Sequence, residues 1–332
     1  MRVLFIALLL FINTSVLAEI LPSTHFKTVQ IFINEMVQEH DFNKSELQFI
    51  FSKIQLKRVD KSTQKKSTAT SSSGKMSWQK YQSLFVTEDR IDSGVIFWKN
   101  NKQTLLDAEI KYGVPSEIIV AILGIETNYG KVQGKYPTLK TLIGKAFGTS
   151  SRRSFYRKEL QSFLLLAREN TLPPLAIKGS SAGALGYAQF IPSSYRYYAV
   201  DFNNDFKVDL FNNTQDAIGS IANYLAKHNW QNNGEIITII ELDKDRQSLA
   251  QTKISKPTHN AQHWRELGVD IGSEISEDTK LAFIRLKGDQ SMQTWLTFWN
   301  FYAITRYNHD NRYAMTVYQL SEQLKQAFTS TI

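Results

Sequence analysis

The sequence predicts an α+β fold in which helices dominate and a late segment forms a small β-rich insertion. Apolar residues recur every three or four positions along most of the chain, which is the spacing of amphipathic helices. Short runs rich in β-branched and aromatic residues occur between about 231 and 300. With 332 residues and 42% hydrophobic content, the chain is long enough to bury a core and to form more than one lobe.

The helical segments come in two blocks. Residues 24–59 alternate apolar and polar side chains at helical spacing. The stretch 61–75 is rich in Ser, Thr and Lys and predicts a surface loop or linker. From 76 to 230 the pattern is again mostly helical, most clearly at 154–169 and 217–230.

After residue 230 the composition changes. The segments 234–243, 279–288 and 294–305 are rich in β-branched and aromatic residues and predict a small β-rich insertion, whereas 313–328 is helical again. The expected order is a signal peptide at 1–18, an N-terminal helical region with its linker at 19–75, a helical core at 76–230, the insertion at 231–300 and a C-terminal segment at 301–332 that returns to the core.

The first residues have the composition of a secretory signal peptide. Arg2 precedes an apolar run at 3–12, and small residues follow, ending at Ala18. A membrane anchor is the alternative, but this run is shorter than the roughly 20 residues that a spanning helix needs. We therefore expect cleavage after Ala18 and a mature protein without stable membrane insertion.

The chain contains no cysteine and has a net charge of +8. Without cysteine it forms no disulfide and carries no lipid on an N-terminal cysteine, so we expect a soluble extracytoplasmic protein. The charge indicates either a solvated basic surface or attraction to a polyanion. We expect no nucleic-acid partner, because the sequence has neither a basic helix with interleaved aromatics nor a zinc-finger spacing.

One carboxylate occupies an unusual position. The stretch "PSEIIVAILGIETNYG", residues 115–130, predicts a helix that begins near Pro115, with Glu126 in its last turn. The partial negative charge of a helix C-terminus and apolar neighbours both raise a carboxyl pKa, which suits a general acid at neutral pH. Alternatively, Glu126 faces solvent or pairs with a lysine such as Lys131, and this stretch alone leaves both hypotheses open.

The segment "KGSSAGALGYAQFIPSSY", residues 178–195, is dense in small residues. Its glycines permit close backbone approach, and Ser180, Tyr187 and Gln189 place polar groups among them. Such a surface suits a flat, hydroxyl-rich ligand. Tight packing of small residues against another helix is the alternative.

The segment 201–216 resembles an EF-hand loop. Oxygen-bearing side chains occupy positions one, three and five: Asp201, Asn203 and Asp205. Lys207 offers a backbone carbonyl at position seven. Phe206 replaces the usual glycine and Asn212 the usual glutamate, so a hydrated turn and a calcium site both remain open.

Three segments carry a resemblance to a known family: "GIETNYGKVQGKYPTLKTL", "KGSSAGALGYAQFIPSSYRYYAVDF" and "FYAITRYNHDNRYAMTVYQL". Together they resemble the lytic murein transglycosylase B family, bacterial enzymes with a lysozyme-like core that cleave peptidoglycan. The match runs in order from about Ser77 to Leu320. It implies peptidoglycan glycan strands as the partner. The signal peptide predicts a periplasmic location. No motif indicates a catalytic cofactor, and we expect a monomer.

The resemblance implies roles for individual residues. Glu126 would be the sole catalytic acid and base. Sugar binding would fall to Ser180, Gln189, Tyr224, Tyr307, Asn308 and Tyr313, with a groove tyrosine at Tyr81 and a paired arginine at Arg152 and Arg153. Asp216 matches the late aspartate of a variant calcium loop in the family, so the implied ligands of a structural Ca²⁺ are Asp201, Asn203, Asp205, Lys207 and Asp216.

Other interpretations stay open for these side chains. Each tyrosine could be a core or rim aromatic, Asn308 a turn residue, and the two arginines solvated. In the implied reaction, Glu126 protonates the β-1,4 glycosidic oxygen and then accepts a proton from the muramyl C6 hydroxyl, giving a 1,6-anhydro sugar. A hydrolytic muramidase and a non-catalytic wall-binding scaffold are the alternatives, and the retained Glu126 argues against the scaffold.

Overall fold

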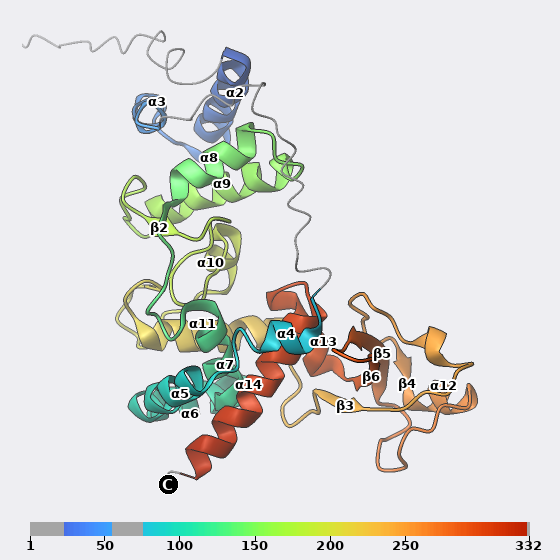
Figure 1. Cartoon of the computed structure of the whole chain (residues 1–332). Helices are drawn as coiled ribbons and strands as arrows, with labels where there is room; N and C mark the ends of the chain where they lie inside the picture. The colour runs from blue at the N-terminus through green and yellow to red at the C-terminus, as the bar shows by residue number, and fades with distance from the viewer. Residues whose placement is uncertain (1–22, 55–75, 331–332) are drawn as a thin grey trace, which may run out of the picture. The chain divides into compact units, whose positions relative to one another are not determined.

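The computed structural model describes residues 23–54 and 76–330 (Figure 1). The predicted signal peptide and the linker at 61–75 lie outside the described residues. The described chain forms two compact units, which we call unit 1 (residues 23–54, 134–184 and 191–193) and unit 2 (residues 76–133, 185–190 and 194–330). Both are mainly helical with small sheets, which confirms the predicted class.

Unit 1 consists of four helices and a two-stranded ribbon. Its elements are α2 (Ser23–His40), α3 (Lys44–Ser52), β1 (Tyr136–Pro137), α8 (Thr138–Phe147), α9 (Arg153–Glu169) and β2 (Lys178–Gly179). The helical pattern predicted at 154–169 is confirmed, and that at 24–59 is confirmed by α2 and α3, with residues 55–59 outside the described residues. Phe32 on α2 joins three helices, because its ring centroid lies 6.0 Å from that of Phe51 and 5.8 Å from that of Phe147.

Unit 2 contains the remaining described helices. These are α4 (Trp78–Gln82), α5 (Glu88–Asn100), α6 (Lys102–Tyr112), α7 (Ser116–Thr127), α10 (Pro192–Tyr198, in unit 2 from Ser194), α11 (Thr214–Lys227), α12 (Ala261–Glu266), α13 (Trp299–Tyr307) and α14 (Asn311–Thr329). Helix α7 packs against α5, α6, α11 and α14, and its residues 118–124 are all buried. The apolar run of this helix is therefore the centre of the unit.

A four-stranded antiparallel sheet completes unit 2. Its strand order is β3-β6-β5-β4, formed by β3 (Ile237–Ile239), β6 (Met292–Thr297), β5 (Lys280–Lys287) and β4 (His259–Asn260). Trp264 of α12 packs edge-to-face on Phe283 of β5 with ring centroids 4.9 Å apart. The strands predicted within 234–243 and 279–288 are thus confirmed.

The prediction for 294–305 is correct only for its first part. Strand β6 ends at Thr297, and the chain turns helical at Trp299 despite its aromatic composition. Tertiary packing outweighs β propensity here, because Phe301, Ala303 and Ile304 present one buried side of α13.

Asn300, at the start of α13, binds the backbone of the segment that leads into β3. The side chain is fully buried; its Oδ1 accepts from Gln231 N at 2.7 Å, and its Nδ2 donates to Gln231 O and Gly234 O, each at 2.8 Å. Across the residues that the structure describes, no helix has the length and apolar character needed to cross a membrane.

We expect Asn300→Ala to lower the free energy of unfolding by about 1–3 kcal/mol, because it removes three hydrogen bonds and leaves buried backbone groups without partners. Urea unfolding monitored by circular dichroism measures the change. Gln262→Ala is the control, since this exposed side chain makes one hydrogen bond, to Glu266. Equal midpoints for the two variants would show that Asn300 is not an anchor.

Candidate active site

Glu126 occupies the last turn of α7, as predicted. The helix ends at Asn128, whose φ of 49° is left-handed, and Tyr129 follows with a φ of 59°. Lys131, the alternative partner from the sequence, instead donates from Nζ to Ser93 Oγ at 3.2 Å. Among the described residues Glu126 forms no ion pair, so its charge is not neutralised by a cation.

The partner of Glu126 is a tyrosine far away in the sequence. Tyr313 Oη donates to Glu126 Oε1 at 2.7 Å, and Tyr313 itself is only 1% exposed. Burial raises the pKa of Glu126 to about 7, and the hydrogen bond from Tyr313 opposes part of that rise. A carboxyl group with this pKa is present in both protonation states at neutral pH, which suits a group that first gives and then takes a proton.

A second tyrosine supports the first. Tyr307 lies parallel to Tyr313, with ring centroids 6.4 Å and ring planes 8° apart, and its hydroxyl donates to Ala188 O at 2.5 Å. Burial and the nearby charge of Glu126 hold the pKa of both phenols well above the usual value. Both tyrosines therefore stay neutral hydrogen-bond donors.

Tyr224 belongs to the same aromatic cluster, but its hydroxyl is hydrogen-bonded within the protein. Its ring centroid lies 4.9 Å from that of Tyr307, and its hydroxyl donates to Arg306 O at 2.5 Å. The residue is 8% exposed. The observed contacts make Tyr224 a support for Tyr307 in this structure.

The loop 185–190 carries Gln189 beside the end of α7. Thr127 Oγ1 donates to Tyr187 O at 3.1 Å, and Gln189 Nε2 donates to Gln133 O at 3.1 Å. The loop requires Gly186, which has a φ of 64° and on which a Cβ would lie 2.2 Å from Leu210 O. Glu126 and Gln189 are thus held by connected parts of unit 2.

Tyr81 on α4 is the groove tyrosine of the prediction. Burial raises the pKa of Tyr81 to about 12, and the charges of Asp310 and Glu126 also act to raise it. The Arg312 guanidinium lies 5.1 Å from the Tyr81 ring centroid and forms an ion pair with Asp310 at 2.5 Å. The structure therefore brings Tyr81, Glu126, Tyr307 and Tyr313 into one neighbourhood.

The other predicted residues belong to a turn of unit 2 or to unit 1. Asn308 is exposed at the C-cap of α13, where its carbonyl accepts from Asp310 N at 2.7 Å. Ser180 belongs to unit 1, and its Oγ accepts from Ala182 N and Ala184 N at 3.2 and 3.0 Å. Arg152 and Arg153, also in unit 1, are exposed, and Arg152 lies 4.0 Å above the Phe155 ring.

Sequence reasoning missed the pair Asp310 and Arg312. The chain signals it only by the charged residues of "HDNRY" directly before Tyr313. Asp310 caps α14 by accepting from Arg312 N at 2.9 Å, which fixes the turn that presents Tyr313. The pair therefore positions a functional side chain.

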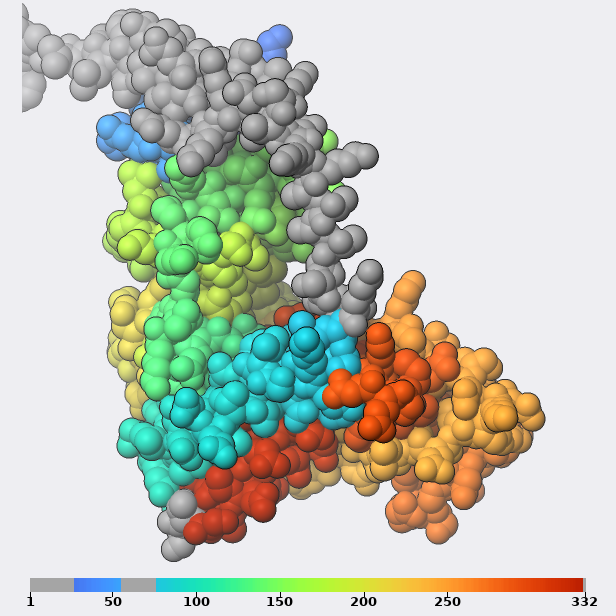
Figure 2. Space-filling model, viewed as in Figure 1, coloured from blue at the N-terminus to red at the C-terminus, as the bar shows by residue number. Residues whose placement is uncertain are grey.

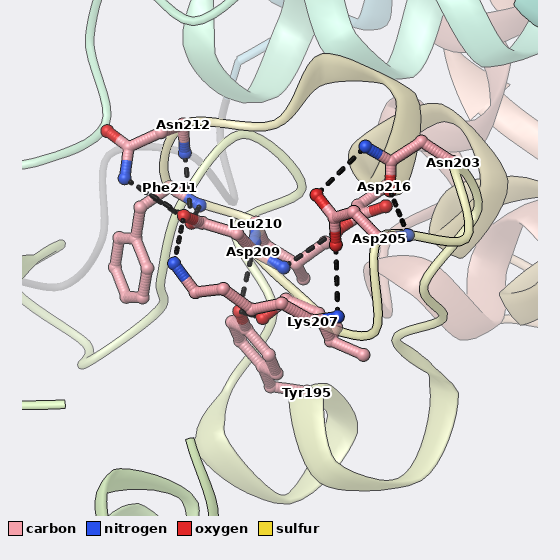
Figure 3. A network of polar contacts seen from close by, with 10 residues as sticks. Tyr195, Asn203, Asp205, Lys207, Asp209, Leu210, Phe211, Asn212 and Asp216 are labelled. Carbon is pink, nitrogen blue, oxygen red and sulfur yellow. Dashed lines mark hydrogen bonds and ion pairs between the residues drawn. The ribbon is translucent and has the colours of Figure 1, made fainter. Parts of the chain in front are cut away.

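The predicted calcium loop is a network of Asx contacts (Figure 3). Asp201 accepts from Asp205 N at 3.1 Å and from Phe206 N at 2.7 Å. Asp216 is fully buried and accepts from Phe202 N and Asp209 N at 2.9 and 2.7 Å.

The loop backbone takes the left-handed form that glycine would favour. Phe206 has a φ of 67° with its side chain fully exposed, so the loop adopts this conformation although phenylalanine replaces the usual glycine. Within the described ranges, no three His, Cys, Asp or Glu side chains converge as a metal cluster.

Comparisons with known proteins show the family of the chain. The chain matches the family described as Transglycosylase SLT domain over residues 25–322. It is 36% identical over 298 residues to membrane-bound lytic murein transglycosylase B of Escherichia coli, covering 88% of this chain and 81% of the relative.

Solved structures give the same result. Catenated lytic transglycosylase SltB1 of Pseudomonas aeruginosa is 35% identical with a TM-score of 0.80, covering 91% of this chain and 98% of that one. Escherichia coli Slt35, solved in complex with calcium, is 36% identical with a TM-score of 0.78, covering 90% of this chain and 93% of that one. The chain therefore belongs to the transglycosylase SLT domain family and is a lytic murein transglycosylase.

Proposed function

We propose that this enzyme cleaves the β-1,4 bond between N-acetylmuramic acid and N-acetylglucosamine of peptidoglycan and leaves 1,6-anhydromuramic acid ends. One observation carries the proposal. Glu126 accepts a hydrogen bond from Tyr313 at the end of α7, and burial raises the pKa of the Glu126 carboxyl to about 7. The role in the cell would be turnover or remodelling of the wall.

In the first step, Glu126 acts as a general acid. Its carboxyl proton passes to the glycosidic oxygen as the bond from that oxygen to muramyl C1 breaks. The positive charge that develops at C1 is stabilised by the substrate's own 2-acetamido group or by nearby hydroxyl and carbonyl dipoles. Tyr313 stays hydrogen-bonded to the carboxylate that this step leaves behind.

In the second step, the same group acts as a base. The Glu126 carboxylate takes the proton of the muramyl C6 hydroxyl as that oxygen bonds to C1, which regenerates the acid and closes the anhydro ring. A single carboxyl group suffices because the nucleophile belongs to the substrate. In the described part of the chain no second carboxylate contacts Glu126, and Asp310 is ion-paired with Arg312.

The proposal extends to location and assembly. A cleavable signal peptide at 1–18 would place the mature enzyme in the periplasm, and the lack of cysteine means that no cysteine-linked lipid would anchor it. We propose that it acts as a monomer on glycan strands. All the predicted sugar contacts remain candidates: Tyr81, Arg152, Arg153, Ser180, Gln189, Tyr224, Tyr307, Asn308 and Tyr313.

The reaction has a direct test in the Glu126→Gln variant. We expect release of muropeptides from purified sacculi to fall roughly 100- to 10,000-fold, because glutamine neither gives nor takes the proton. Mass spectrometry of the wild-type products should show sugar ends lighter by one water than the hydrolysed sugar. Glu117→Gln, in the first turn of the same helix, is the matched control and should keep activity.

Two results would contradict this proposal. Undiminished digestion by Glu126→Gln would remove the role of Glu126 altogether. Reducing ends in the wild-type products would mean that water is the nucleophile and that the enzyme is a muramidase.

We also propose that the loop 201–216 binds a structural Ca²⁺. The donor set is purely oxygen, which suits this hard cation: Asp201, Asn203, Asp205, the Lys207 carbonyl and Asp216. The left-handed backbone at Phe206 supports the proposal, because the residue adopts the conformation that the usual glycine of an EF-hand loop adopts at this position. The Slt35 relative was solved with calcium.

Calcium binding predicts a change in thermal stability. We expect the melting temperature to be higher in millimolar Ca²⁺ than in the presence of a chelator. The increase should be roughly 2–4 °C for each kcal/mol of stabilisation by bound Ca²⁺. Asp201→Ala should abolish the difference, and Asp243→Ala, in an exposed turn outside the loop, should keep it. If the wild type melts at one temperature in both conditions, the loop is only a turn.

A further inference from the structure

Two histidines lie side by side in the β-rich region of unit 2. Figure 2 shows this region (orange) projecting from the helical part of the unit, and α12 lies at its outer end in Figure 1. His259 is on β4 and His263 is on α12, and their ring centroids lie 4.4 Å apart. Both rings also contact Trp264, so the pair is separate from the aromatic cluster around Glu126.

The two rings rest on a fixed support. Asn260, between them in sequence, caps α12 by accepting from His263 N at 3.1 Å, which sets the turn from β4 into the helix. Trp264 is 8% exposed, and its ring centroid lies 5.4 Å from that of His259 and 5.3 Å from that of His263. Trp264 Nε1 donates to Leu281 O of β5 at 3.3 Å, so the support is anchored in the sheet.

The ring nitrogens of the pair are available as ligands. Three other histidines, His40, His228 and His309, each place a ring nitrogen within hydrogen-bonding distance of another residue. Among the described side chains, the rings of His259 and His263 have no such partner. A neutral imidazole nitrogen is the commonest metal ligand in proteins, so two of them meet here.

The separation of the rings matches two ligands of one metal ion. A metal–nitrogen bond is about 2.0–2.1 Å long, so imidazoles bound at a right angle have centroids about 4.5 Å apart, and at a tetrahedral angle about 5.1 Å apart. The observed 4.4 Å fits the right angle of a tetragonal or square-planar Cu²⁺ site. Binding also requires the rings, whose planes are 22° apart, to turn one nitrogen each toward the ion, and the exposed position of His259 permits this rotation.

The charge around the pair favours a cation. The segment 259–280 contains two basic and five acidic residues, so its net charge is −3 in a chain whose net charge is +8. All five acidic side chains are exposed, and within the described chain none of them forms an ion pair: Glu266, Asp270, Glu274, Glu277 and Asp278. Such a local excess of negative charge raises the concentration of cations beside the two imidazoles.

We propose that His259 and His263 bind a transition-metal ion, with Cu²⁺ bound most tightly and water completing its coordination. Imidazole suits Cu²⁺, and divalent first-row metals bind a given site in an order that peaks at Cu²⁺. The ion joins β4 to α12 and is distinct from the Ca²⁺ proposed for the loop 201–216, since that loop offers oxygen ligands.

Calorimetric titration of the purified enzyme with Cu²⁺, added as its glycine complex in millimolar Ca²⁺, tests the proposal. We expect one high-affinity ion per chain, which excess Ca²⁺ does not displace because Ca²⁺ takes oxygen ligands. His259→Gln and His263→Gln should each lower the affinity about 100-fold, because two linked ligands bind far more tightly than one. His40→Gln is the matched control and should keep the wild-type affinity.

Electron paramagnetic resonance gives a second measurement on the same samples. At saturating Cu²⁺ the wild type should show two imidazole nitrogens on the ion, whereas His259→Gln should show one. Because His259 is exposed, this variant should fold normally even if His263→Gln does not.

Three results would overturn the proposal. The first is a wild-type affinity no higher than that of His259→Gln. The second is an equal loss of affinity in His40→Gln, which would place the ion elsewhere. The third is displacement of the ion by Ca²⁺, which would assign it to oxygen ligands.

Discussion

The hydrogen bond from Tyr313 to Glu126 is the interaction on which the site depends. It joins the last turn of α7 to the first turns of α14, across 187 positions of sequence. Removing water from a carboxyl group disfavours its charge, whereas a donor on the carboxylate favours it. The two effects oppose each other, and their balance leaves the pKa of Glu126 at about 7. A proton that is nearly free to leave or return at neutral pH is the requirement of a one-carboxyl mechanism.

This arrangement costs stability. Because the pKa of Glu126 is raised from 4.5 in the folded state, the folded protein binds a proton that the unfolded chain releases between those pH values. The free energy of unfolding therefore falls as the pH rises from about 4.5 through about 7. The full pKa shift of Glu126 corresponds to about 3 kcal/mol. Close packing around α7 offsets this loss of stability. At Gly124, for example, the Tyr129 ring packs so closely that an added Cβ would lie 2.8 Å from it.

Features that depend on one continuous segment of the chain could be predicted from the sequence. The apolar run before Glu126 and the proline ahead of it were enough to place the carboxylate in the last turn of a helix. The amphipathic period was likewise enough for α9, α11 and α14. The helix at Trp299 was not predictable from composition, because aromatic residues favour strands until buried packing on one face decides otherwise.

Features that depend on contacts between distant parts of the sequence could be predicted only from the resemblance to the family, and some could not be predicted at all. Periodicity does not reveal which of 14 tyrosines contacts Glu126. The hydroxyl of Tyr224 donates to Arg306 O, whereas that of Tyr313 donates to Glu126 Oε1. Phe206 shows the same limit, since its left-handed backbone follows from the Asx contacts of Asp201 and contradicts the preference of its own residue type.

Direct titration of Glu126 tests the central claim most closely. In protein labelled with ¹³C at glutamate carboxyls, the Glu126 signal is identified by its loss in Glu126→Gln and followed with pH. The account predicts a pKa of about 7, and a still higher pKa in Tyr313→Phe, because that variant removes the hydrogen bond that lowers it. A value near 4.5 in both proteins would contradict the account.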